Sequence, residues 1–359
     1  MTSHTVHVAP SSGAYDVVVG PGILDEAGKR LAPLLPSTSA FIISDSNVAP
    51  LYLERLQASL AAAGIDAPHA VFPAGEASKN LSTLSDLLEA MAMARLTRSS
   101  AVIALGGGVT GDMAGLAAAL YMRGIAYVQV PTSLLAMVDS SVGGKCAVDL
   151  AAGKNLAGAF LQPLAVLADT STLQTLDGSV FSDGCAEIVK HAALADPELF
   201  GQLETEPLAR EGEPGLLASV IARNVDIKRR FVEADEREQG QRKLLNLGHS
   251  IGHAIEAASG YTLGHGHAVA MGLCAIARAS EKVGWAEQGI ADRIEAVAAA
   301  HGLPTESPYP ADDLIGYARL DKKSEAGGIT LAIPERIGSA SLRFAGFDEF
   351  SELIRLGVA

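Results

Sequence analysis

The stretch AVIALGGGVTGDMAGLAAALYM, residues 101–122, decides the expected fold of the first half of the chain. A short apolar run, a cluster of glycines and an alanine-rich run follow one another, which predicts a strand, a tight turn and a helix. Gly106, Gly108 and Gly111 satisfy the GxGxxG spacing in that context. Glycines there let the backbone approach a pyrophosphate, and the helix start offers free N–H groups and a positive dipole end.

The glycine pattern alone leaves two interpretations open, a nucleotide-binding loop and a tight structural turn. A standard dinucleotide fingerprint has an acidic residue about 20 positions later that binds the ribose. The corresponding stretch here, RGIAYVQVPTSLLA, contains no acidic residue, and the motif lies well inside the predicted domain. Asp45, which follows the apolar stretch AFIIS, is an alternative ribose ligand.

Short apolar runs alternate with amphipathic helical runs on both sides of this motif. Buried strands are expected at residues 39–45, 69–73, 101–105, 125–130 and 164–169. This alternation predicts a mostly parallel sheet covered on both faces, a Rossmann-like arrangement. Helical periodicity dominates from about residue 181 to 303, with a late strand pair within residues 329–344. We therefore expect an α/β domain over residues 1–178 and a mainly α-helical domain over residues 179–359.

The composition excludes several classes of protein. The 359 residues are 48% hydrophobic and 19% charged, so disorder is not expected. A net charge of −14 disfavours nucleic acid and anionic membranes as partners. The three cysteines are scattered, no signal peptide is visible, and no apolar run reaches the roughly 18–20 residues of a membrane helix. These features predict a cytoplasmic protein in which an anionic substrate would need a local basic pocket.

The segment LNLGHSIGHAIEAASGYTLGHGHAVAMG, residues 244–271, holds four of the nine histidines. A metal site, a proton-transfer site and purely structural histidines are the competing interpretations. If NLGHSIGHAIE is one helix, four polar residues share one face because they are spaced by three, four and three positions: Asn246, His249, His253 and Glu256. His265 starts a following helix, and two imidazoles from two helices need a third ligand to hold a metal with an open position. Glu187, in AEIVKH beside Lys190 and His191, is a candidate for that ligand.

Eight ordered blocks carry a resemblance to a known family: FPAGEASK, ALGGGVTGDMAGLAAALYMRG, VPTSLLAMVDSSVGGKCAV, GKNLAGAF, AEIVKH, DEREQGQRKLLNLGHSIGHAIE, HGHAVAMG and LDKK. With these blocks the chain resembles the 3-dehydroquinate synthase family of sugar phosphate cyclases along nearly its whole length. The resemblance implies an N-terminal NAD-binding α/β domain and a C-terminal helical domain that binds a metal and the substrate.

The resemblance also implies roles for individual residues. One divalent ion, zinc or cobalt, would be bound by Glu187, His249 and His265. NAD would be bound by Asp45, Asn47, Glu76, Lys79, Gly107, Gly108, Val109, Thr110, Gly111, Asp112, Thr132, Ser133, Lys145, Lys154, Thr172 and Thr175. The substrate and its chemistry would be served by Arg123, Asp139, Lys145, Lys154, Asn155, Lys190, Lys228, Arg242, Asn246, His253 and Lys322 or Lys323 of the LDKK block. Arg123 would reach into the active site of the neighbouring subunit of a homodimer.

The reaction that the resemblance implies explains the basic residues in an acidic protein. The family substrate, 3-deoxy-D-arabino-heptulosonate 7-phosphate, carries a carboxylate and a phosphate, and the products are 3-dehydroquinate and phosphate (EC 4.2.3.4, a lyase of the shikimate pathway of aromatic amino-acid biosynthesis). NAD takes up a hydride and returns it. His253, one helical turn from His249, is expected to carry a proton.

Three other functions stay open at this point. A metal-dependent alcohol dehydrogenase of the glycerol-dehydrogenase type shares the glycine loop and the paired histidines, but it has no need of so many cationic residues. Another sugar phosphate cyclase would be expected to alter the pocket residues, and a non-catalytic NAD or metal sensor would show no turnover. The chain departs from the commoner family pattern at Cys185 and at His267, where an acidic residue is frequent. We expect His267 to be structural.

Overall fold

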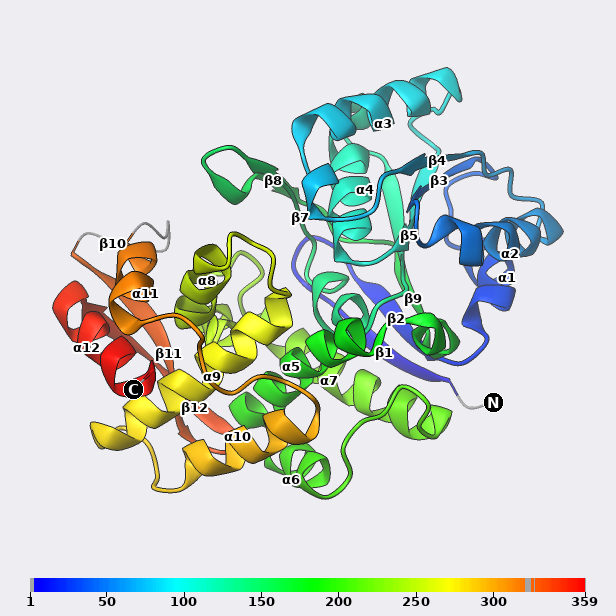
Figure 1. Cartoon of the computed structure of the whole chain (residues 1–359). Helices are drawn as coiled ribbons and strands as arrows, with labels where there is room; N and C mark the ends of the chain where they lie inside the picture. The colour runs from blue at the N-terminus through cyan, green and yellow to red at the C-terminus, as the bar shows by residue number, and fades with distance from the viewer. Residues whose placement is uncertain (1–2, 320–323, 326, 359) are drawn as a thin grey trace. The chain divides into compact units, whose positions relative to one another are not determined.

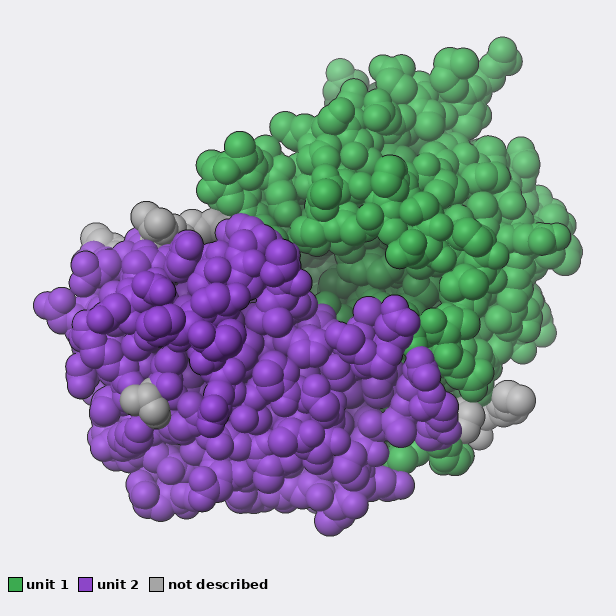
Figure 2. All heavy atoms as spheres, viewed as in Figure 1, with its two compact units in different colours: residues 1–176, 213–229 green, residues 177–212, 230–359 purple. Residues whose placement is uncertain are grey.

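The computed structural model describes residues 3–319, 324–325 and 327–358. The chain forms two compact units, Met1–Leu176 with Glu213–Arg229, and Asp177–Gly212 with Arg230–Ala359 (Figure 2). Residues 213–229 thus belong to the first unit, although they lie within the sequence range expected for the second domain.

A seven-stranded sheet forms the centre of the first unit, with the strand order β1-β2-β9-β6-β5-β3-β4 (Figure 1). Its strands are β1 His4–Val8, β2 Tyr15–Gly20, β3 Ala40–Asp45, β4 His69–Phe72, β5 Ala101–Gly106, β6 Ala126–Pro131 and β9 Ala165–Asp169. Every neighbouring pair is parallel except β1 and β2. The five predicted strands and the mostly parallel α/β fold are therefore confirmed. The prediction that all five are buried is wrong for β4, which lies at the edge of the sheet and is mostly exposed.

Helices cover both faces of this sheet because successive side chains of a strand point to opposite faces. Ile42 and Ile103 pack on one face against residues of α1 and α2, whereas Phe41 and Val102 pack on the other against residues of α3 and α4. These helices are α1 Ala27–Leu31, α2 Ala49–Ala62, α3 Leu81–Met93 and α4 Gly108–Leu120. The unit also contains the antiparallel hairpin β7 Lys145–Leu150 and β8 Gly153–Phe160, and the short helical segments η1 Ile23–Glu26, η2 Glu76–Ser78, η3 Tyr121–Arg123, η4 Ala136–Ser140 and η5 Thr170–Thr175.

The second unit is mainly helical and is organised around α9, which packs against α5, α8, α10 and α12. Its helices are α5 Gly178–Ala195, α6 Pro197–Thr205, the end of α7 Pro214–Ala234, η6 Gln241–Asn246, α8 His249–Ala258, α9 His265–Lys282, α10 Ile290–Ala300, α11 Ala311–Ala318 and α12 Phe347–Val358. A three-stranded antiparallel sheet completes it, with β10 Ser324–Glu325, β11 Gly328–Arg336 and β12 Ser339–Gly346. The predicted late strand pair is confirmed. Within the described part of the chain, no helix combines the length and apolarity needed to cross a bilayer.

The prediction that Asn246 shares one helix with His249 is wrong. Asn246 ends η6, and α8 begins only at His249 because Gly248 between them has a left-handed backbone with φ of 79°. A Cβ atom on Gly248 would lie 2.8 Å from the backbone nitrogen of Leu273, so this turn can lie against α9 only as glycine.

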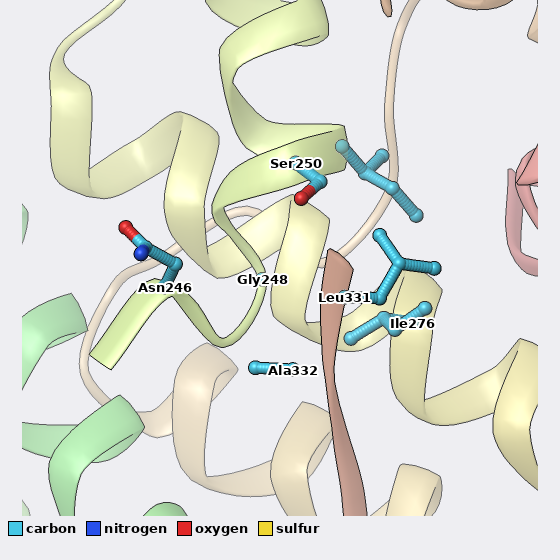
Figure 3. A pocket seen from close by; sticks show the side chains of 7 residues that line it. Asn246, Gly248, Ser250, Ile276, Leu331 and Ala332 are labelled. Atoms are coloured by element: carbon cyan, nitrogen blue, oxygen red, sulfur yellow. The ribbon is translucent and has the colours of Figure 1, made fainter. Parts of the chain in front are cut away.

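Figure 3 shows the surroundings of this turn. A small pocket at Gly248 is lined on one side by the apolar side chains of Ile276 and Leu331, and the carboxamide of Asn246 points away from them. A Cβ on Gly272 of α9 would lie 2.2 Å from the carbonyl oxygen of Gly248. This close crossing of α8 and α9 brings the histidines of α8 near His265.

Candidate metal centre and nucleotide loop

Glu187 lies in the middle of α5 with a carboxylate that is 0% exposed. Among the described residues, neither of its oxygens accepts a well-directed hydrogen bond. Nitrogen atoms nevertheless surround them: Lys190 forms an ion pair with the carboxylate, and the Nε2 atoms of His191, His249 and His265 lie 3.7, 3.6 and 3.8 Å from its oxygens. A buried carboxylate without well-directed donors is unusual, and a bound cation would satisfy its lone pairs.

The three predicted ligands come together in the second unit. The ligand atoms of Glu187, His249 and His265 all lie within 4.8 Å of one another. Tetrahedral coordination with bonds of about 2.0–2.2 Å separates ligand atoms by about 3.4 Å, which is close to the 3.6 and 3.8 Å between Glu187 Oε1 and the two Nε2 atoms. Two imidazoles and one carboxylate form a donor set that suits zinc or cobalt.

His249 is oriented for such a role by the turn that precedes α8. Its Nδ1 lies 3.2 Å from the carbonyl oxygen of Leu247. Donation of the Nδ1–H to that carbonyl leaves the Nε2 lone pair directed toward Glu187, which is the tautomer that a metal ligand needs.

His265, in the first turn of α9, faces a carboxylate with each ring nitrogen. Its Nε2 faces Glu187, and its Nδ1 lies 3.4 Å from Oε2 of the buried Glu256, while the side chain is 32% exposed. Burial alone would lower the pKa of His265, but the hydrogen bond to Glu256 and the charge of Glu187 raise the pKa above its usual value. A carboxylate behind the far nitrogen is the usual partner of a metal-binding histidine.

His253 stands one turn along α8 from His249, with ring centroids 5.4 Å apart. A second group of potential ligand atoms also lies within 4.8 Å of one another, from His253, Glu256 and His265. We favour the group that contains Glu187, because Glu256 has the Nδ1 of His265 as a partner whereas Glu187 accepts no well-directed hydrogen bond from the described residues. His253 then stands beside the centre, and its role as a proton carrier stays a prediction.

The glycine loop of the first unit has the predicted strand–turn–helix form. Gly106 ends β5, Gly107 precedes α4, and the next five predicted nucleotide ligands form the start of that helix: Gly108, Val109, Thr110, Gly111 and Asp112. A Cβ on Gly106 would lie 2.5 Å from Thr110 Oγ1, so this glycine also serves the packing of the loop itself. Thr132 lies beside the loop and donates its N–H to the carbonyl of Gly106 over 3.0 Å. A Cβ on Gly107 would lie 3.4 Å from Ser133 Oγ.

Asp45 ends β3 next to the same loop. Its Oδ1 accepts the N–H groups of Asn47 and Val48 over 2.9 and 3.1 Å, and its Oδ2 accepts the hydroxyl of Thr110 over 2.9 Å. Protein donors therefore occupy both oxygens, and Asp45 holds the start of α2 and of α4 together. Its role as a ribose ligand stays a prediction, as does that of the exposed Asn47.

Two further predicted nucleotide ligands lie in η5. Thr175 Oγ1 is 2.6 Å from the hydroxyl of Tyr52 and donates to the carbonyl of Thr172. Tyr52, on α2, also donates to that carbonyl over 3.0 Å. Sequence reasoning had no signal for Tyr52, because its partners lie more than a hundred residues away.

Lys79 connects predicted NAD and substrate residues. Its Nζ forms an ion pair with Asp112 at 2.6 Å and donates to Asn155 Oδ1 at 2.6 Å. Burial alone would lower the pKa of Lys79, but the charges of Asp112 and Glu76 raise the pKa above its usual value. Glu76 itself forms an ion pair with Lys154 at 3.4 Å.

Asp149 is a residue of this cluster that the sequence did not reveal. Asn155 has a left-handed backbone with φ of 54°, a strained conformation for a residue with a side chain. Asp149 accepts the Asn155 N–H over 2.7 Å and donates its own N–H to the carbonyl of Lys79 over 2.8 Å. Asp149 thereby holds both Asn155 and Lys79 in place.

Three more predicted substrate residues are also held by acidic or carbonyl oxygens. Lys228 of α7 donates to Asp139 Oδ1 over 2.6 Å. The buried Arg242 donates to the carbonyl of Glu236. Asn246 donates to Glu238 Oε1 over 2.6 Å, and Glu238 is a further residue that the sequence did not reveal.

Of four further predicted residues, two are exposed and two lie outside the described residues. Lys145 is exposed at the start of β7, and Arg123 is exposed in η3 with φ of 70°. Lys322 and Lys323 lie outside the described residues. The reach of Arg123 into a partner subunit stays a prediction.

Comparison with known proteins identifies the family of this chain. Residues 69–183 match the N-terminal part of 3-dehydroquinate synthase, and residues 184–324 match its C-terminal part. The chain is 44% identical over 346 residues to the 3-dehydroquinate synthase of Caulobacter vibrioides, with 94% of each chain covered.

Two solved structures are also similar. One is a 2-deoxy-scyllo-inosose synthase complexed with carbaglucose-6-phosphate, NAD+ and Co2+ (25% identity, TM-score 0.88, 99% of this chain and 100% of that one). The other is the 2-epi-5-epi-valiolone synthase ValA of Streptomyces hygroscopicus subsp. jinggangensis with NAD+ and Zn2+ bound (31% identity, TM-score 0.85, 95% of each chain). On the sequence matches and on this fold, the chain belongs to the 3-dehydroquinate synthase family.

Proposed function

We propose that this chain converts 3-deoxy-D-arabino-heptulosonate 7-phosphate to 3-dehydroquinate and phosphate. One observation carries the proposal: in a chain of this family, His249 and His265 converge on the fully buried carboxylate of Glu187. Relatives that form other rings and alcohol dehydrogenases remain the alternatives. No observation on this chain favours either of them.

The donor sets described above fit both proposed cofactors. Glu187, His249 and His265 would hold one zinc or cobalt ion, and the glycine loop with Lys79, Asp112 and the other nucleotide residues would hold NAD. When bound, the metal supplies polarisation of substrate oxygens, and NAD supplies a reversible hydride acceptor.

The charged residues of the chain perform the binding. The substrate carries a carboxylate and a phosphate, and each charge-assisted hydrogen bond to lysine or arginine contributes about 1.5–3 kcal/mol. Asp139 fixes Lys228 and the Glu236 carbonyl fixes Arg242, so these two cations are oriented before any ligand arrives. Such prior orientation lowers the entropy lost on binding.

Proton transfer is assigned to His253. Imidazole has an unperturbed pKa near 6.5, about the value at which it can both accept and release a proton at neutral pH. Its ring lies within 6.0 Å of His265, centroid to centroid, so it can reach atoms of a substrate bound at the centre.

We further propose the assembly and setting of the enzyme. Residues 1–178 would serve NAD, and residues 179–359, which include Lys228, would serve the metal and the substrate. The enzyme would be a cytoplasmic homodimer in which Arg123 reaches the partner, without nucleic acid or membrane as partners. The net charge of −14 supports the last point.

A phosphate-release assay on the heptulosonate phosphate tests the function directly. We expect release only when both NAD and a divalent metal are present, with no net accumulation of NADH. Accumulation of NADH without phosphate release would indicate an alcohol dehydrogenase. Phosphate release from another sugar phosphate alone would indicate a different cyclase.

The roles of the two α8 histidines are separated by substitution. His253→Ala should retain metal and NAD but lose turnover by roughly 10²–10⁴-fold, whereas His249→Ala should lose the metal. Metal analysis of the purified variants gives the answer, since loss of the ion from His253→Ala would make His253 a ligand.

A further inference from the structure

The first turn of α9, which carries His265, is bound to α5 by one side chain. Asp183 lies one turn before Glu187 on α5, and its Oδ1 accepts both the backbone N–H of His267 over 3.0 Å and the ring Nδ1–H of His267 over 2.8 Å. Both side chains are 15% exposed. Gly264, which precedes α9, provides no side-chain cap, so Asp183 satisfies a free N–H of this helix from another helix.

The two helices also lie too close together here for any side chain at two positions. A Cβ atom on Gly266 would lie 1.8 Å from the carbonyl oxygen of Asp183, and one on Gly264 would lie 2.4 Å from Asp183 Oδ1. The backbone on either side of His265 therefore rests directly on α5 at Asp183. Two carboxylates of α5, one turn apart, thus face the same turn of α9.

We infer that Asp183 and His267 form a positioning pair that sets His265 at the correct distance from Glu187 to share one metal ion. The inference rests on the proposed metal centre. Ligand atoms have to be held within about 0.5 Å of their productive places, by packing together with supporting hydrogen bonds. Asp183 accepts two hydrogen bonds from His267, which lies two positions after His265. These bonds fix both the position of the first turn of α9 along its axis and its rotation about that axis.

The same pair accounts for the departure of this chain from the commoner pattern at His267. An imidazole at this position pairs with the carboxylate that Asp183 supplies, whereas an acidic side chain would repel it. His267 Nε2 also lies 3.3 Å from the hydroxyl of Ser182. The Ser182 hydroxyl donates its proton to the carbonyl of Ser179 over 3.0 Å instead of to His267. Ser182, His267 and Asp183 therefore do not form a triad that activates the serine as a nucleophile.

Metal affinity, measured by chelator competition with Zn2+ and by cobalt absorption spectra, tests the pair. Asp183→Ala should weaken binding about 10–100-fold, as loss of a supporting residue behind a ligand does. Asp183→Asn should retain most of the affinity, because its amide oxygen accepts both N–H groups. His267→Ala should lose less than Asp183→Ala, and the double variant should be no worse than Asp183→Ala. His301→Leu, which removes another buried histidine of the same unit, is the matched control and should leave the affinity unchanged.

Hydrogen exchange on the unaltered protein gives a second readout that does not depend on variant folding. Addition of Zn2+ should slow exchange of the His267 amide, because the metal and the pair hold the same turn. Unchanged affinity in a folded Asp183→Ala, or unchanged exchange at His267, overturns the inference. A loss of affinity in Asp183→Ala as large as that in Glu187→Ala would instead make Asp183 a ligand and also overturn the inference. If the unaltered protein binds no Zn2+, the proposed centre itself fails.

Discussion

Glu187→Gln separates the two roles of this carboxylate, as a metal ligand and as the partner of a buried cation. The Glu187 side chain is 0% exposed and that of Lys190 is 2% exposed. Removing one member of such a buried pair typically costs about 3–5 kcal/mol, because the other charge is left without its partner. Against a total stability of about 5–15 kcal/mol, the metal-free variant should be folded but much less stable.

Lys190→Met and the double variant Glu187→Gln/Lys190→Met complete a cycle. Lys190→Met should cost less than Glu187→Gln, because Glu187 still has His249 and His265 at 3.6 and 3.8 Å. The double variant should regain most of the stability lost by Glu187→Gln, because neither buried charge remains. Urea unfolding of the metal-free proteins measures these differences.

Metal affinity should follow a different pattern across the same cycle, because it depends on Glu187 alone. Structural zinc sites with four ligands bind with about 10–16 kcal/mol, so one ligand contributes about 3–4 kcal/mol, or roughly 10²–10³-fold. Glu187→Gln and the double variant should both lose that amount, whereas Lys190→Met should retain binding. Metal affinity within about threefold of the original in Glu187→Gln would refute the ligand assignment. A double variant as unstable as Glu187→Gln would refute the account of the buried charge.

Three other predictions follow from single contacts. Glu256→Ala should weaken Zn2+ about 10–100-fold in chelator competition yet still saturate at one ion; complete loss would make Glu256 a ligand. Asp149→Ala should lower the free energy of unfolding by about 1 kcal/mol and kcat/KM by about tenfold, because Asn155 loses the acceptor that holds its strained backbone; unchanged kinetics would show that Asn155 needs no such support. Burial lowers the pKa of His301, whose Nε2 accepts the Leu208 N–H over 3.1 Å, so folding should lose stability as the pH falls below about 6.5 toward the folded pKa. His301→Leu should flatten this dependence and cost about 1–3 kcal/mol at pH 7.5, and an unchanged pH profile in urea unfolding would contradict the assignment.

The sheet of the first unit could be predicted because its signals are local. The predicted strands β3, β5, β6 and β9 are short runs of mostly apolar residues buried on both faces, and the glycine loop after β5 has the composition of a tight turn before a helix. β1 and β2 escaped prediction, since β1 alternates partly exposed residues and pairs antiparallel at the sheet edge.

The break before α8 shows how a correct spacing argument can fail. Asn246 and His249 have helical spacing, but the spacing argument assumes an unbroken helix. Gly248 takes a left-handed backbone because its turn lies against α9, a contact that no local pattern reveals. An isolated glycine within a helical pattern was the available signal.

The positioning carboxylates were missed for a different reason. Asp183 and His267 are 84 residues apart in the chain, and Asp149 acts on Asn155 through a backbone N–H that sequence spacing does not mark. Residues that touch a substrate or metal belong to recognisable motifs, whereas residues that hold them in place are defined only by the fold.

The choice between Glu187 and Glu256 as the acidic ligand illustrates what the fold adds. Both lie on helices next to histidines, and the sequence alone gives each a spacing that suits a metal. The structure separates them by their partners: Glu256 faces the Nδ1 of His265, and Glu187 faces the Nε2 atoms of both His249 and His265. Because Glu187 faces two imidazole Nε2 atoms and Glu256 faces only the far nitrogen of His265, we propose Glu187 as the metal ligand and Glu256 as the support behind His265.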